Sequence, residues 1–107
     1  MSKESETARR DALLARRLDL VASVSALTAE ALRLNQKRAG IEMEVLRVEL
    51  EIGRSGANAQ LVRDLHEAEQ SMTAILQAGA ACEDRIVAVE ADIEELDRRL
   101  VATANKN

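Results

Sequence analysis

The sequence contains no tryptophan, tyrosine, phenylalanine or proline. Compact globular cores normally use aromatic side chains to fill volume, whereas a narrow bundle of helices can be packed by Leu, Ile, Val and Ala alone. An interior proline costs a helix about 3 kcal/mol, so the absence of proline permits long helices. Since 47% of the 107 residues are nevertheless hydrophobic, the composition is typical of a coiled coil.

The chain is also poor in the features that direct a protein out of the cell or onto nucleic acid. Its single cysteine excludes an intrachain disulfide, which fits a reducing compartment. The net charge of −4 gives no overall attraction for nucleic acid or anionic lipid. No apolar signal-peptide core or membrane-spanning stretch is present in the sequence. We therefore expect a cytoplasmic protein that does not bind membranes; incorporation into a virion and secretion without a leader remain open.

What the sequence does contain is a heptad repeat, with positions labelled a to g, over almost its whole length. Positions a and d of a coiled coil face the partner helix. In the first half they hold Leu13, Leu20, Val24, Leu27, Ala31, Leu34, Ile41, Val45, Val48 and Ile52. In the second half they hold Leu61, Leu65, Ala68, Met72, Ile75, Cys82, Ile86, Val89, Ile93, Leu96 and Leu100. These positions are called the a/d seam; its non-conforming members are Arg10, Arg17, Arg38, Asn58, Gly79 and Thr103.

The segment EIGRSGANAQ, residues 51–60, interrupts this pattern. Two glycines within a helix would cost about 2 kcal/mol, whereas Gly53 suits the position after a helix end and Ser55 or Asn58 can cap the next helix. We therefore expect an all-α fold, a single antiparallel two-helix coiled-coil hairpin over residues 1–107. Helix 1 is predicted at about residues 5–52, the turn at about 53–57 and helix 2 at about 58–103. A continuous helix that pairs only between chains is the alternative.

A second set of apolar residues lies outside the seam, at positions b and e. In an antiparallel pair the e positions of both helices share one side, so this set forms one face, the b/e face, opposite a charged g/c face. Burying a leucine contributes about 1.5–3 kcal/mol, so leaving this face in water would forgo several kcal/mol. We therefore expect another chain to cover the face. The predicted partner-binding residues are Leu14, Leu18, Val21, Leu32, Leu46, Val62, Leu76 and Val87.

Two partners fit the b/e face. A second copy of the hairpin would complete a four-helix bundle or a larger helical oligomer. Alternatively, the face would accept a basic amphipathic helix of another protein, because acidic residues border it: Glu42, Glu49, Glu69, Glu83, Glu90 and Asp97.

Residue types that carry catalysis or bind metals are sparse. His66 is the only histidine, and Gln70 stands where a zinc-binding His-Glu-x-x-His motif requires the second one. Cys82 falls at a d position, where a buried small hydrophobic residue is expected. The carboxylates near the end of helix 2 lack calcium-loop spacing. We therefore expect no enzyme activity, no cofactor and no metal.

The arginines at seam positions are expected to fix the register by reaching carboxylates, Arg17 toward Glu94, Glu95 or Asp97, and Arg38 toward Glu42 and Glu69. The open end of the hairpin also collects basic residues, which form an alternative nucleic-acid-binding set: Arg9, Arg10, Arg16, Arg17, Arg98 and Arg99. Because acidic neighbours offset these charges and no aromatic ring can stack on a base, nucleic acid is the less favoured partner.

The sequence thus predicts a non-enzymatic protein–protein interaction module. It would be a self-associating hairpin that acts as a small adaptor, a chaperone or a structural component of an assembly, as in secretion systems or phage particles. The alternative is a hairpin-dimer regulator that binds nucleic acid through the basic open end.

Overall fold

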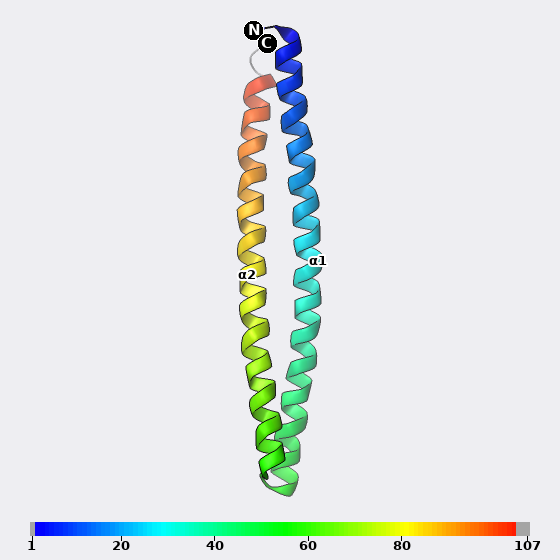
Figure 1. Ribbon diagram of the computed structural model, residues 1–107, viewed down its shortest axis with the longest axis vertical. Coiled ribbons are helices and arrows are strands. Elements are labelled where there is room, and N and C mark those ends of the chain that lie inside the picture. The colour runs from blue at the N-terminus through cyan, green and yellow to red at the C-terminus, as the bar shows by residue number, and fades with distance from the viewer. Residues whose placement is uncertain (1, 105–107) are drawn as a thin grey trace. The chain divides into compact units, whose positions relative to one another are not determined.

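The computed structural model describes residues 2–104, which form two α-helices (Figure 1). Helix α1 spans Lys3–Ser55 and helix α2 spans Ala59–Ala104. The described chain has no β-strand, so the predicted all-α class is confirmed. Over these same residues, neither helix contains a stretch apolar enough to cross a bilayer.

Helix α1 begins one residue after a serine cap. The backbone N–H of Ser5 donates a hydrogen bond to Ser2 Oγ at 3.2 Å, which satisfies one of the unpaired donors of the first turn. Glu4 and Glu6 place negative charge at the same end, where the helix dipole favours it. These interactions explain why α1 starts at Lys3, slightly earlier than the sequence pattern suggested.

The reversal of the chain centres on Gly56 rather than on Gly53. Gly56 has φ of 82°, a left-handed conformation that L-residues with a side chain rarely adopt. Its N–H donates to the carbonyl of Ile52 at 2.8 Å, the hydrogen bond of a left-handed helix cap. Helix α1 therefore continues through Gly53 to Ser55, and the turn is shorter than the predicted residues 53–57. Asn58 then caps α2, because its Oδ1 accepts the N–H of Leu61 at 2.9 Å.

Contacts between the helices fall into two compact units. Unit 2 is Glu30–Cys82; it contains the turn, and its α1 and α2 segments form an antiparallel helical hairpin. Unit 1 joins residues 2–29 with residues 83–104. Arg10 contacts Leu100, and Arg17 contacts Asp97, so these two segments are also antiparallel, as predicted.

The core of each unit lies along the a/d seam. The buried hydrophobic residues all occupy d positions: Leu20 and Leu96 in unit 1, and Val48, Ala68 and Cys82 in unit 2. Of the remaining seam positions, only Arg10, Arg38 and Asn58 are exposed, and the others are partly buried. The heptad pattern thus identified which side of each helix faces the other.

Candidate interaction surface

Large apolar side chains remain exposed on both units. They are Leu14, Leu18, Val21, Val87 and Val101 in unit 1, and Leu32, Met43, Leu46, Leu50, Val62 and Leu76 in unit 2, with exposed fractions from 39% to 72%. All eight predicted partner-binding residues are among them. The two-helix packing within each unit therefore does not bury these residues, while their contact with a partner stays a prediction.

Met43 and Leu50 were missed by the sequence reasoning. Both occupy f positions, and they are 69% and 67% exposed. The predicted face comprised only positions b and e, whereas Met43, Leu46 and Leu50 are spaced by three and then four residues and so share one side of α1. That spacing was visible in the sequence. These three residues belong to a longer series of b and f positions in unit 2, called here the outer strip of α1: Leu32, Gln36, Ala39, Met43, Leu46, Leu50 and Gly53.

The outer strip is open to solvent and hollowed near its end. A shallow groove is lined by Leu46, Leu50 and Gly53, with Glu49 and Arg54 at its margins. A Cβ atom added to Gly53 would meet no atom within 4 Å, so packing within the chain does not require glycine there. Because glycine in a helix interior costs about 1 kcal/mol relative to alanine, Gly53 weakens α1 without any gain inside the chain.

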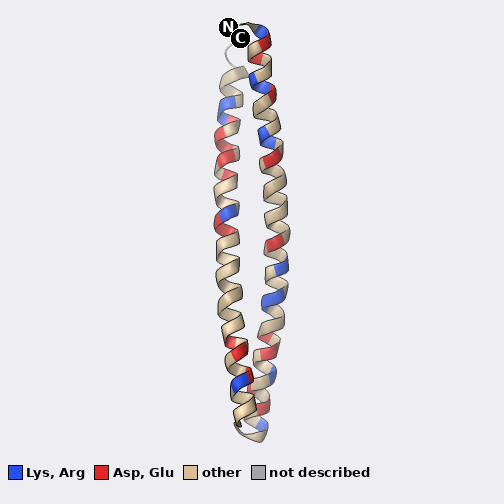
Figure 2. Ribbon diagram, viewed as in Figure 1, with Lys and Arg blue, Asp and Glu red and all other residues tan. Residues whose placement is uncertain are grey.

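The charged g/c face of α1 is neutralised by its own residues in unit 2. Each glutamate at position g pairs with the arginine three residues later: Glu30 with Arg33, Glu44 with Arg47 and Glu51 with Arg54, at 2.6, 2.6 and 3.4 Å. The hydrogen bond from Arg47 lowers the pKa of Glu44. Figure 2 shows the resulting interleaving of acidic and basic residues toward the turn. Exposed pairs of this kind stabilise a helix by only a few tenths of a kcal/mol, and they leave little net charge.

The b/e face is different, since from Asp11 onward no lysine or arginine occupies a b or e position in the described chain. Its acidic members are Asp11, Glu42, Glu49, Glu69, Glu83, Glu90, Glu94 and Asp97. In unit 2, a second shallow groove is lined by Glu42, Glu49 and Glu69 together with Val45, Leu46 and Met72. Glu42 lies 3.7 Å from Arg38, as predicted, whereas the predicted contact of Arg38 with Glu69 is not formed. Glu49 and Glu69 form no ion pair with the described residues. This face is therefore both apolar and acidic.

The arginine at position 17 ties the two helix segments of unit 1 together. Its Nε donates to Oδ1 of Asp97 at 2.7 Å and its Nη2 donates to Oδ2 at 3.4 Å. This hydrogen bond lowers the pKa of the Asp97 carboxyl. The predicted contact of Arg17 with an acidic residue is thus confirmed, and Asp97 is the residue involved.

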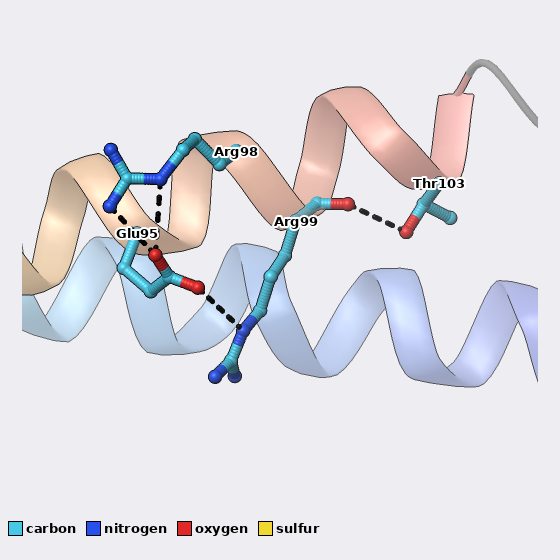
Figure 3. Close-up of polar contacts among 4 residues, drawn as sticks. All are labelled: Glu95, Arg98, Arg99 and Thr103. Carbon is cyan, nitrogen blue, oxygen red and sulfur yellow. Dashed lines mark hydrogen bonds and ion pairs between the residues drawn. The ribbon is translucent and has the colours of Figure 1, made fainter.

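Several members of the alternative nucleic-acid-binding set already have partners. Figure 3 shows Glu95 between Arg98 and Arg99, which approach separate oxygens at 2.7 and 3.5 Å. The hydrogen bond from Arg98 lowers the pKa of Glu95. Arg10 donates to the carbonyl of Leu100 at 3.4 Å, and Arg17 is held by Asp97. A phosphate would have to compete with these contacts, which reduces the attraction of this end for nucleic acid.

The remaining candidate residues lie apart from one another. His66 is exposed at a b position, and Cys82 is buried within the seam. Residues 2–104 contain no cluster of three or more His, Cys, Asp or Glu side chains arranged to hold a metal ion.

No protein family, curated protein or solved structure shows significant similarity to this chain. The exposed apolar side chains and the charge pattern are therefore the basis on which its function is inferred.

Proposed function

We propose that this chain is a non-enzymatic protein–protein interaction module that associates with a second copy of itself. The observation that carries the proposal is the imbalance between buried and exposed apolar side chains. Among residues 2–104, five hydrophobic residues are buried, whereas eleven large ones are exposed. Single exposed apolar residues are common on protein surfaces, but a periodic series along helices is typical of an interaction surface.

The accessible area supports a partner of substantial size. A compact globular protein of 11.7 kDa exposes about 5,900 Å² by the usual scaling of area with mass. This chain exposes 7875 Å², an excess of roughly 2,000 Å². A standard protein–protein interface buries about 800 Å² on each partner, and obligate dimers bury more. Association with a second copy would thus cover a substantial part of this excess.

In this proposal the oligomer acts as a small adaptor, chaperone or structural component of a larger assembly, of the kind found in secretion systems and phage particles. That role follows from fold class and surface alone. The alternative, a regulator that binds nucleic acid, has less support because Arg17, Arg98 and Arg99 are already paired with carboxylates.

The proposal is tested by the mass of the protein in solution. We expect light scattering and sedimentation equilibrium to give a multiple of the 11.7 kDa chain mass. The protein concentration should run from about 1 to about 100 µM, a range that spans weak to moderate affinities. A monomer throughout would contradict self-association. A salt-dependent shift of nucleic acid by the protein at physiological ionic strength would instead favour the regulator.

A further inference from the structure

We propose that the second copy docks on the outer strip of α1, so that the strips of two copies pack against each other with their α1 helices parallel. This inference rests on the proposed self-association, and it names the surface and the orientation that produce it. It differs from the sequence-based prediction, which spread the contact over the b/e face of both helices.

The outer strip has the spacing of a second coiled-coil seam. Its residues alternate between b and f positions, three and four residues apart, as a and d residues do. The strip lies on the side of α1 away from the a/d seam, so unit 2 presents one helix that is apolar on two opposed sides. Met43 and Leu50 are its most exposed large members. Gly53, which has open space where a Cβ would lie, would let a partner helix approach closely.

Helix α2 offers no comparable strip in unit 2. Val62 and Leu76 are exposed e residues, but Glu69 stands between them, two turns from each. The f position nearest to Val62 holds Arg63. Two copies that met over the b/e face would also bring Glu42, Glu49 and Glu69 of one copy toward those of the other. Like charges brought together oppose association.

The charges beside the outer strip distinguish a second copy from a basic partner helix. No residue of the strip is charged. One flank, formed by e positions, carries Glu42 and Glu49, and the other flank, formed by c positions, carries Arg33, Arg47 and Arg54. A lysine-rich helix would meet the arginine flank as well as the glutamate flank. A surface with one acidic and one basic flank is instead complementary to a copy of itself.

The same flanks favour the parallel orientation. In parallel packing, a residue on one flank approaches the residue about five positions later on the opposite flank of the partner helix. Glu42 would then approach Arg47 of the second copy, and Glu49 would approach Arg54. Antiparallel packing centred on the strip would place Glu42 beside the Glu42 of the second copy and Arg33 beside its Arg54. Arg47 and Arg54 pair within α1 through exposed contacts, which are weak enough to be shared or exchanged.

Two matched variants test the surface. Leu50→Lys changes the outer strip without touching the b/e face, and Leu76→Lys changes the b/e face of α2; both lie within unit 2, at side chains that are 67% and 51% exposed. Lysine keeps a good helix propensity, so circular dichroism should show full helix content in both. Under the proposal, Leu50→Lys raises the dissociation constant of the oligomer at least about tenfold, equivalent to about 1.4 kcal/mol, and Leu76→Lys leaves it within about twofold of the wild type.

A spin label at residue 35 tests the orientation without changing the strip. Asn35 is exposed beside it, and Asn35→Cys in a Cys82→Ala background leaves one thiol for labelling. Parallel packing predicts an interchain distance below about 20 Å, because packed helix axes lie about 8–10 Å apart. Antiparallel packing centred on Met43 would separate the two labels by about 24 Å along the axis, since sixteen residues rise about 1.5 Å each. If Leu50→Lys loses helix content, this measurement on the unmodified strip still tests the parallel orientation.

The outcomes separate the inference from the proposed function. A wild-type chain that is monomeric overturns both; if a lysine-rich amphipathic peptide then binds it, the partner is a basic helix. An oligomer that survives Leu50→Lys but dissociates with Leu76→Lys overturns the inference and leaves self-association intact. Equal weakening by both variants, or an interchain label distance near 30 Å, also overturns the parallel packing of the outer strips.

Discussion

Replacing Val48 by alanine tests whether the a/d seam holds unit 2 together. Val48 is a d residue with 0% exposure, and Val48→Ala removes two methyl groups from a packed site. Each buried carbon contributes about 0.8 kcal/mol, and the cavity that remains adds to the loss. The higher helix propensity of alanine returns about 0.5 kcal/mol. We therefore expect Val48→Ala to lower the free energy of unfolding by about 2 kcal/mol.

The matched control is Val62→Ala, in the same unit and outside the seam. Val62 is 52% exposed, so the same two methyl groups contribute less burial there, and the gain in helix propensity offsets most of the loss. Its expected effect is within about 0.5 kcal/mol of zero.

The assay is thermal unfolding followed by circular dichroism. All three proteins are compared at one concentration, because the midpoint of a self-associating protein depends on concentration. For a chain of this size, a loss of 2 kcal/mol lowers Tm by about 10 °C. A loss for Val62→Ala equal to that for Val48→Ala would refute the assignment of the seam as the main source of stability. So would a loss below about 0.5 kcal/mol for Val48→Ala.

Two further predictions concern the turn and the interhelical ion pair. Gly56→Ala should lower the free energy of unfolding by about 1–2 kcal/mol, because Gly56 has a positive φ that alanine adopts poorly. Gly53→Ala should raise it by up to about 1 kcal/mol, because alanine has the higher helix propensity. Urea unfolding of the two variants checks both values, and the opposite ranking would contradict the assigned helix end. The hydrogen bond with Arg17 lowers the pKa of Asp97 in the folded state. The stability that this hydrogen bond contributes is therefore present above the pKa of Asp97 in the unfolded state. It is lost as the pH falls through the lower pKa of Asp97 in the folded state. Asp97→Asn should lower Tm at pH 7 and flatten the acid limb of the Tm–pH profile, and an unchanged acid limb would show that the pair contributes nothing.

The seam could be predicted from the sequence because burial along a long helix pair follows a simple period. Leu20 and Val48 are four heptads apart, and both are buried at d positions. The absence of proline and aromatic residues removed the main sources of irregular packing. Register followed from the same period, which is why the contact of Arg17 with the second helix near residue 97 could be anticipated.

The helix end could not be assigned in advance, because two glycines three residues apart both suit it. The helix ends at the glycine that must adopt a positive φ. Which of the two glycines does so depends on the position of the cap of the next helix, Asn58. Gly56 is the residue that meets this condition.

The outer strip was missed for a different reason. The predicted face comprised positions b and e, whereas Met43 and Leu50 lie at f positions, on the far side of α1. An f residue of a two-helix hairpin is normally polar, so apolar residues there indicate a contact that the hairpin itself does not make. Searching each helix for a second series of three- and four-residue spacings would have found it.

In the proposed dimer the two outer strips contact each other, and the methyl group of Met43 reports on that contact most directly. In a dimer of one isotope-labelled and one unlabelled chain, isotope-filtered NOE spectra detect only contacts between copies. We expect interchain NOEs from the Met43 methyl to the methyl groups of Ala39 and Leu46, the adjacent layers of a parallel pair, and none from Met72, which is partly buried in the a/d seam of its own chain. Interchain NOEs that connect Val62 or Leu76 instead, with none from Met43, would contradict the account.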